Sequence, residues 1–383
     1  MTVNPGWGGY YPNFLWGDLG GGTGFGPGGT GQFAGVNFHL GRGFTLGGML
    51  TRNDFNGLSI AKLDPGVLVY TGGGDLTLVS LTSLVPNVVP LNNNLELMGA
   101  YKTGNTSIGL GVAYASTTAE ATPSAGGTSS ASASQIGVNA GIVTKLSGNF
   151  MLDLGASLLL PSATFEPATG SATEFSQTYI LANARFFYNY SAKLAFVPTI
   201  IFVTSSGTAD IGGATTTSTD LTSMTLIAFG VGINYEVGDF LLAGGPSFAT
   251  TSLTIPENTG QWPELSQSVL SFPMWNLGAE WNMNEWFVAR LGYVASTHKA
   301  TADIEESGTE AGEFITTLFG PSGATVGVGF RLGNFSLDAT VNEGVLRQGL
   351  NNIGGGGPTF AYLSASLSMP VSYTHLTLPT KRI

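Results

Sequence analysis

The fold is decided by the segment SIGLGVAYA at residues 107–115, in which large apolar residues alternate with small ones. Successive side chains of a β-strand point to opposite faces, so a period of two indicates a strand with two different environments. Ile108, Leu110, Val112 and Tyr114 share one face, and Gly109, Gly111, Ala113 and Ala115 share the other. The segment therefore predicts a strand with one face of large apolar residues and one face of small residues.

The same alternation recurs along the chain, at residues 135–146, 150–160, 227–235, 326–332, 335–341 and 361–367. A soluble β-sandwich also alternates, but its polar face carries charged residues such as Lys and Glu. Here the second face is mostly Gly, Ala, Ser, Thr and Asn. The pattern favours an all-β fold, a transmembrane antiparallel β-barrel with lipid outside and a lumen inside.

Composition agrees with a barrel and excludes other classes. The chain has 383 residues, 57 of them Gly, and only 10% are charged, against about 25% in soluble proteins. Mean hydropathy is +0.22, yet the sequence has no run of about 18 apolar residues that could form a spanning helix. A net charge of −11 argues against nucleic acid as a partner. With no Cys, disulfides and thiolate chemistry are excluded.

Turn signals set the topology. Short turns are predicted at residues 41–43, 102–105, 147–149, 189–192, 238–239, 282–285 and 333–334. They alternate with long polar segments at residues 117–132, 205–219, 254–265 and 298–321. Short periplasmic turns and long extracellular loops are typical of outer-membrane barrels. Seven hairpins, a strand at residues 360–369 and one at residues 11–19 give about 16 strands, with 14 as the alternative.

We expect residues 1–369 to form a single barrel domain in the bacterial outer membrane, with lipid and lipopolysaccharide around it. No signal peptide is visible, so the start is expected to be incomplete, cleaved or internal. Residues 370–380, PVSYTHLTLPT, resemble the in-frame translation of a transposon-end sequencing adapter. We therefore expect residues 370–383 to be a non-native tail. Aromatic residues beside short turns, including Tyr10, Tyr11, Phe14 and Trp16, predict a periplasmic girdle on the exterior.

Catalytic patterns are weak. His39 and His298 are predicted at opposite ends of the wall, so they cannot act together. No GxSxG nucleophile motif occurs, and the glycine-rich residues 20–29 lack the GK[ST] ending of a phosphate loop. The sequence therefore predicts a protein that is not an enzyme and that has no cofactor and no metal site.

Charged and amide side chains are expected on the lumen face, because charges facing lipid are costly. They either form a network of ion pairs that rigidifies the barrel or line an aqueous path. The predicted lumen-lining residues are Glu96, Asn139, Lys145, Asp153, Asn183, Glu280, Arg331 and Asp338, together with Arg185 and Arg290.

The longest segment between strands, residues 53–94, is unusually apolar. A loop in water would be more polar, so this segment is expected to fold over or into the barrel mouth. There it forms a constriction, a plug or an apolar groove. The predicted capture residues are Leu81, Leu84, Val85 and Val88, with Arg185 and Arg290 orienting a polar headgroup.

Three segments carry a family resemblance: Asn4-Pro5-Gly6, YPNFLW at residues 11–16, and GVNFHLGRGFTLG at residues 35–47. They resemble outer-membrane proteins of the long-chain fatty-acid transporter type. The resemblance implies a 14-strand barrel, an NPA-like motif near an amino-terminal hatch, and passage of apolar compounds through a lateral opening.

Three functions remain open. The first is passive uptake of small hydrophobic compounds, such as fatty acids or aromatics. The second is a general diffusion porin, in which lumen charges set conductance. The third is a non-transporting barrel that anchors or shuttles secreted partners. The sequence leaves the oligomeric state open.

Overall fold

The computed structural model describes residues 3–18, 33–51, 93–121, 128–166, 171–212, 217–257, 263–306, 309–320, 322–341 and 360–368. They comprise one 18-stranded sheet and the 3-10 helix η1 (Pro5–Gly9). In this part of the chain, no helix is both long and apolar enough to cross a membrane. Most of residues 53–94 and the predicted tail, residues 370–383, lie outside the described residues.

The strands are β1 (Phe14–Asp18), β2 (Phe33–Gly41), β3 (Phe44–Thr51), β4 (Asn93–Thr103), β5 (Thr106–Ala121), β6 (Ser129–Lys145), β7 (Phe150–Glu166), β8 (Thr173–Asn189), β9 (Leu194–Ile211), β10 (Thr217–Asp220), β11 (Ser223–Val237), β12 (Phe240–Ile255), β13 (Glu264–Asn282), β14 (Phe287–Glu306), β15 (Thr309–Phe319), β16 (Gly323–Leu332), β17 (Phe335–Val341) and β18 (Phe360–Ser368).

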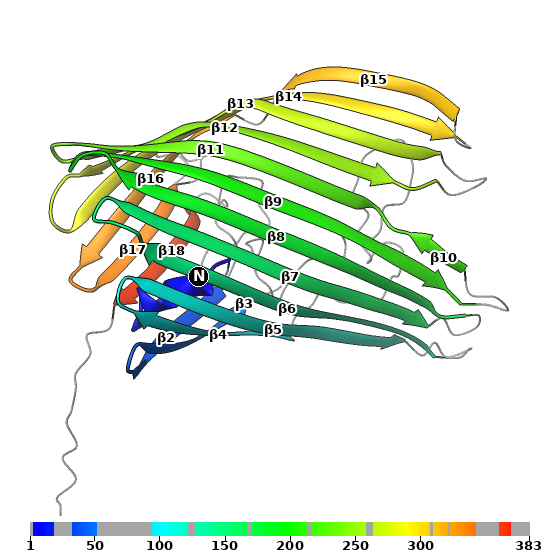
Figure 1. Ribbon diagram of the computed structural model, residues 1–383, viewed down its shortest axis with the longest axis horizontal. Coiled ribbons are helices and arrows are strands. Elements are labelled where there is room, and N and C mark those ends of the chain that lie inside the picture. Colours follow the sequence, from blue (N-terminus) through cyan, green and yellow to red (C-terminus); the bar gives the residue numbers. More distant parts are fainter. Residues whose placement is uncertain are drawn as a thin grey trace, which may run out of the picture.

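The sheet closes on itself, because β1 pairs with β18 on one side and with β2 on the other. β9 pairs with β11, and β14 pairs with β16, so β10 and β15 are additions to the rim and not members of the ring. The ring is thus a closed antiparallel barrel of 16 strands, which confirms the prediction (Figure 1).

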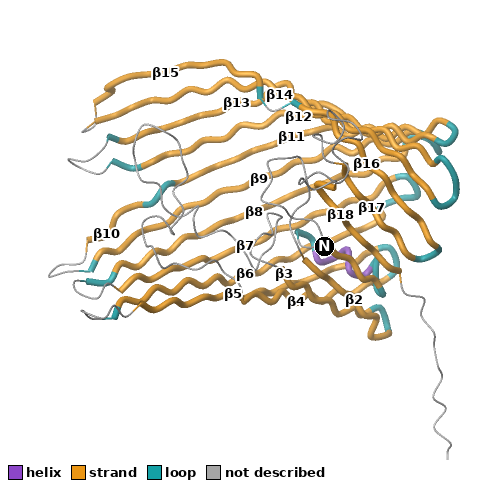
Figure 2. Tube along the Cα trace, turned by 180° about the vertical axis from the view of Figure 1, so that it is seen from behind, coloured by secondary structure: helices purple, strands orange, loops and turns teal. Residues whose placement is uncertain are grey.

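All seven predicted short turns join consecutive ring strands at one end of the barrel (Figure 2). Two of them need glycine for a conformational reason. Gly238 and Gly333 have φ of 58° and 61°, in the left-handed region that two-residue hairpin turns require.

The predicted long loops are shorter than expected. Residues 117–132 and 298–321 were expected as loops, but β5, β6, β14 and β15 run far into them. The error has a physical cause. Beyond the apolar band both faces of the sheet meet polar surroundings, so hydropathy stops alternating although the hydrogen-bonded ladder continues. Hydroxyl pairs across strands replace apolar contacts there, such as Ser134–Ser162 at 3.0 Å and Ser176–Thr208 at 3.3 Å.

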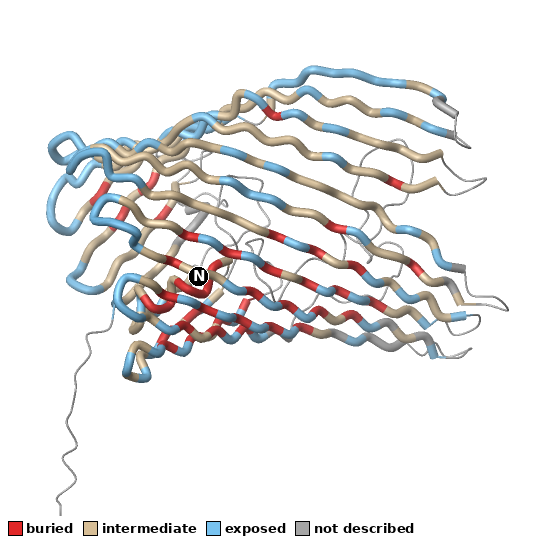
Figure 3. The backbone as a smooth tube through the Cα atoms, in the orientation of Figure 1, coloured by how far each residue is buried: buried red, intermediate tan, exposed pale blue. Residues whose placement is uncertain are grey.

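An apolar band surrounds the exterior. Ile136 on β6 and Leu146, the residue directly after this strand, mark its limits, with exposed fractions of 53% and 60%. The ten steps between them, at about 3.3 Å each on a strand tilted by about 40°, give a height of about 25 Å. This height matches the apolar band of an outer-membrane barrel. Figure 3 shows the alternation of exposed and buried positions along these strands.

The two halves of the lumen differ. Fully buried positions concentrate on the lumen face of β3–β8, around the N-terminal residues (Figure 3). On β11–β14 the lumen face is mostly half-buried or exposed, as at Glu236 and Asn276. The covered half therefore holds the N-terminal residues, and the other half is the accessible one.

Candidate functional site

The N-terminal segment, defined here as residues 3–13, enters the lumen before the chain joins the wall as β1. Its helix η1 packs against β3, β4, β5 and β6 at the end that carries the short turns (Figure 1). Asn4 caps η1, since its side-chain oxygen accepts a hydrogen bond from Gly6 N at 2.8 Å, and Pro5 occupies the first turn. Asn followed by Pro is a favourable helix start.

Asp153 on β7 fixes this segment to the wall. Its side chain is fully buried, and it accepts hydrogen bonds from the Asn4 amide, from Trp7 Nε1 at 2.9 Å, and from Arg185 Nε at 2.8 Å and Nη2 at 2.5 Å. A buried carboxylate is tolerated only when its charge and lone pairs are satisfied. Arg185 supplies the charge, and the N-terminal segment supplies the remaining donors.

Glycines in the wall make room for this attachment. A Cβ atom at Gly141 would lie 1.9 Å from Asn4 Oδ1, and one at Gly109 would lie 2.3 Å from Gly6 N. At Gly155 it would lie 2.7 Å from the Val3 carbonyl oxygen. Any side chain at these three neighbouring wall positions would therefore push the N-terminal segment away.

A row of aromatic rings extends from the attachment. Trp7 contacts Phe187 and Tyr11, with ring centroids 6.2 and 6.1 Å apart. Tyr11 contacts Phe14 at 5.4 Å, and Phe14 stacks on Trp16 at 5.9 Å. The predicted exterior girdle is therefore wrong for these N-terminal aromatics. Tyr11 belongs to the segment that enters the lumen, and Phe14 and Trp16 on β1 share the lumen face with their β2 partners Asn37 and Gly35. Exterior aromatics beside the short turns do occur, for example Tyr188, Tyr190, Trp281 and Trp286.

A second charged cluster lies in the accessible half of the lumen. Arg290 on β14 donates from Nε to Glu280 Oε2 at 2.7 Å and from Nη1 to Asp338 Oδ1. Arg331 Nη2 lies 2.9 Å from Asp338 Oδ1. All four side chains are about 30% exposed.

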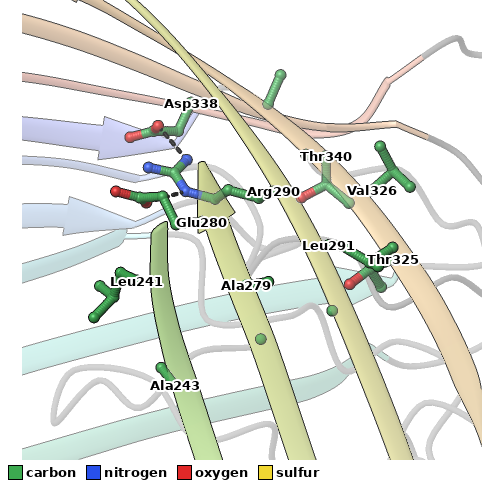
Figure 4. A pocket seen from close by; sticks show the side chains of 14 residues that line it. Leu241, Ala243, Ala279, Glu280, Arg290, Leu291, Thr325, Val326, Asp338 and Thr340 are labelled. Atoms are coloured by element: carbon green, nitrogen blue, oxygen red, sulfur yellow. Dashed lines mark hydrogen bonds and ion pairs between the residues drawn. The ribbon is translucent and has the colours of Figure 1, made fainter. Parts of the chain in front are cut away.

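Glu280, Arg290 and Asp338 of this cluster form one end of a cavity of about 440 Å³ between β12 and β17 (Figure 4). Small residues form its floor, namely Ala243, Gly278, Gly292 and Gly327, and Leu241, Thr325 and Thr340 lie beside them. The cavity is thus largely apolar with a polar end. Pockets of 300–1,000 Å³ with this character are typical of small-molecule sites.

The remaining predicted residues lie apart from this cavity. Glu96 on β4 and Asn139 on β6 are buried in the covered half. Lys145 lies near the N-terminal segment, with its Nζ 6.0 Å from the centroid of the Tyr10 ring. Asn183 on β8 faces Gly155. The predicted capture residues Leu81, Leu84, Val85 and Val88 lie outside the described residues.

Sequence reasoning missed the part that Asn4 and Trp7 play in holding Asp153. Two signals pointed to it. The Asn4-Pro5 pair is a helix start. Gly109, Gly141 and Gly155 are paired on three adjacent strands, at positions that face the lumen. A row of glycines facing inward indicates close approach of another backbone.

Among the described residues, no group of three or more His, Asp or Glu side chains is placed to hold a metal ion. His298 binds two hydroxyls instead. Its Nδ1 lies 2.6 Å from Ser271 Oγ, and its Nε2 lies 3.0 Å from Ser296 Oγ.

Comparison with known proteins gives structural similarity alone. No protein-family description matches the sequence, and no curated protein matches it. The FrpB iron transporter from Neisseria meningitidis is 11% identical with a TM-score of 0.43, and the alignment covers 89% of this chain and 63% of that one. The siderophore receptor PiuA from Acinetobacter baumannii is 10% identical with a TM-score of 0.43, covering 85% and 60%. This chain thus spans less than two thirds of either protein.

The toluene transporter TodX from Pseudomonas putida is 9% identical with a TM-score of 0.37, and the alignment covers 96% of this chain and 93% of that one. At such identities the likeness concerns the fold and not the ligand. The closed 16-strand wall and its apolar exterior band make this chain a β-barrel of the bacterial outer membrane.

Proposed function

We propose that this protein is a channel for the passive uptake of small hydrophobic compounds, in which the N-terminal segment narrows the periplasmic end of the lumen. The observation that carries the proposal is the attachment of this segment to Asp153, inside the barrel and beside the short turns. A general diffusion porin needs a wide aqueous path, whereas a channel for apolar solutes functions with a constricted one.

The accessible half of the lumen supports the same function. Its cavity has a floor of small residues. In the covered half, the aromatic row from Phe187 to Trp16 adds further apolar surface. Apolar solutes gain from leaving water for such surfaces, at about 25 cal/mol per Å². The resemblance of Asn4-Pro5-Gly6 and YPNFLW to the fatty-acid transporter type points in the same direction.

Within this proposal, Leu81, Leu84, Val85 and Val88 capture the solute at the extracellular side, and the ion pairs that contain Arg185 and Arg290 orient its polar group. Both arginines keep carboxylate partners in the wall. They therefore act as parts of ion-pair clusters and not as isolated cations.

The test combines two measurements on the full chain. In whole Gram-negative cells that lack their own channel for such compounds, expression should accelerate uptake of a radiolabelled monoaromatic hydrocarbon or long-chain fatty acid at low concentration. In planar bilayers the purified protein should show little steady conductance. Whole cells are needed because hydrocarbons cross simple lipid bilayers unaided.

The outcomes separate the three functions. Large steady conductance would support a general porin and contradict the proposal. Absence of both uptake and conductance would also contradict it, and would favour a barrel that anchors or shuttles partners through its extracellular loops.

A further inference from the structure

The charge arrangement at the end of the 440 Å³ cavity restricts what can bind there. Glu280, Arg290, Arg331 and Asp338 together carry no net charge, so the cluster does not attract anions as a whole. Arg290 commits Nε and Nη1 to the two carboxylates, and Arg331 commits Nη2 to Asp338 and Nη1 to the Phe330 carbonyl oxygen. These contacts engage two of the five N–H groups of each guanidinium, and the two carboxylates balance both positive charges within the wall.

The carboxylates are the groups that remain able to accept. Each uses one oxygen in the ion pairs between described residues, Oε2 in Glu280 and Oδ1 in Asp338. Glu280 Oε1 and Asp338 Oδ2 are therefore available as acceptors, and both side chains are partly exposed to the cavity, at 28% and 29%. An ionised carboxylate is a strong acceptor for an uncharged O–H donor. It repels a second carboxylate.

The rest of the cavity is suited to a flat or slender apolar body. Gly278, Gly292 and Gly327 leave the floor without side chains. Ala243 adds only a methyl group (Figure 4). Leu241 and Thr340 lie beside this floor. A ligand that fits both parts has an apolar body and one hydroxyl group.

We propose that this cavity is a binding site for small uncharged hydroxylated compounds, phenols or alcohols, which donate their O–H to Glu280 or Asp338 and lay their apolar body on the glycine floor. The site discriminates against carboxylates of the same shape. This inference rests on the proposed function, since it names a solute class for the same lumen.

The site is also close to an exit. Leu241 lines a second cavity of about 700 Å³ at the periplasmic rim, with Asn149, Asn189, Ser191, Lys193, Asn234 and Glu236. The two cavities meet at Leu241, so a compound released from the glycine floor enters a polar mouth formed by the turns that follow β6 and β8.

The test uses three methylbenzenes that differ only at the para position: p-cresol has a hydroxyl group there, toluene a hydrogen atom and p-toluate a carboxylate. Their saturable binding to the purified full-length protein in detergent micelles is measured by saturation-transfer NMR and competition. Because a hydrogen bond to a charged group contributes roughly 1.5–3 kcal/mol, p-cresol should bind about tenfold or more tightly than toluene. The affinity of p-cresol should exceed that of p-toluate by at least the same factor.

Two variants locate the site. In Gly278→Leu the new Cβ lies at ordinary contact distances, 3.6 Å from Ala243 O and 3.9 Å from Leu291 O, so the wall tolerates it while the side chain fills the cavity. Binding of all three compounds should be lost. Asp338→Asn removes one negative charge, so the cluster of Glu280, Arg290 and Arg331 becomes positive. The preference for p-cresol over p-toluate should therefore shrink or reverse. Gly99→Leu is the matched control, because nothing lies within 4 Å of its Cβ position, and it should bind like the unaltered protein.

Equal binding of p-toluate and p-cresol, unchanged binding in Gly278→Leu, or no saturable binding of any compound would each overturn the proposed site. Binding is measured without passage across a membrane. Retained binding with failed cellular uptake would therefore count against the channel function alone, and uptake without saturable binding would count against this site alone.

Discussion

Replacing Gly141 with alanine is predicted to detach the N-terminal segment from the wall. The added methyl group would lie 1.9 Å from Asn4 Oδ1 and 2.3 Å from Asn4 Cγ. Atoms at such distances overlap, so either the wall or Asn4 must move by more than 1 Å, in order to restore about 3.4 Å of separation. The wall strand is held by β5 and β7 on both sides, and hence Asn4 is expected to move.

The magnitude follows from the bonds that Asn4 would lose. Its Nδ2 donates to Ile142 O at 3.2 Å, to Leu154 O at 2.9 Å, and to the Asp153 carboxylate. The amide has two N–H groups, so the two carbonyl oxygens share one of them. One neutral hydrogen bond at about 1 kcal/mol and one to a charged group at about 2 kcal/mol give about 3 kcal/mol. If relaxation recovers half of this, about 1.5 kcal/mol remains, so the ratio of attached to detached segment should fall about 13-fold to 160-fold.

Planar-bilayer recording measures this change directly. Gly141→Ala should spend far more time in conducting states than the unaltered protein, because the segment no longer narrows the periplasmic end. Gly99→Ala is the matched control, since its Cβ position has nothing within 4 Å. Both variants should fold, as judged by the heat-modifiable migration typical of barrels. If the folded Gly141→Ala protein and the Gly99→Ala control conduct alike, the reasoning about the segment is refuted.

Two further predictions concern the same wall. Trp7→Phe keeps an aromatic ring but removes the Nε1 donor to Asp153. A hydrogen bond to a charged group contributes roughly 1.5–3 kcal/mol, so its loss should raise the fraction of time in conducting states about ten- to hundredfold. An unchanged recording would show that this hydrogen bond does not hold the segment. Ala140→Lys places a charge near the middle of the apolar band and should reduce folding stability in vesicles by about 2–4 kcal/mol. Asn276→Lys lies on the exposed lumen face and should reduce folding stability little. If a urea titration shows the same loss of stability for both lysine variants, the assignment of the lipid and lumen faces is contradicted.

Some of the structure could be predicted from sequence because the signals are local. Alternation on β5, β6 and β7 and the short turns give strand number and register within each short hairpin. Glu280 and Arg290 face each other across such a hairpin, so their ion pair was foreseeable from the turn at residues 282–285.

Other parts depend on information that is not local. Asp153 pairs with Arg185 across β7 and β8, which are joined through a longer connection whose length does not fix the register. Asp338 reaches Arg290 across β16, which requires the curvature of the closed wall. The attachment of Asn4 to Asp153 spans most of the first half of the barrel, and no hydropathy pattern reports such a contact.

The central claim is that the N-terminal segment lies inside the barrel against β4, and a designed disulfide tests it most directly. A Cβ atom at Gly8 would lie 3.3 Å from Ala100 Cβ, close to the 3.5–4.5 Å that a disulfide requires. The chain has no Cys of its own, so the variant carrying Gly8→Cys and Ala100→Cys contains only this pair. We predict that it cross-links on export, shown by mass spectrometry, and conducts less than its reduced form. If both thiols instead react with maleimide and cross-linking is no greater than in the control with Gly8→Cys and Gly99→Cys, the segment does not lie where this account places it.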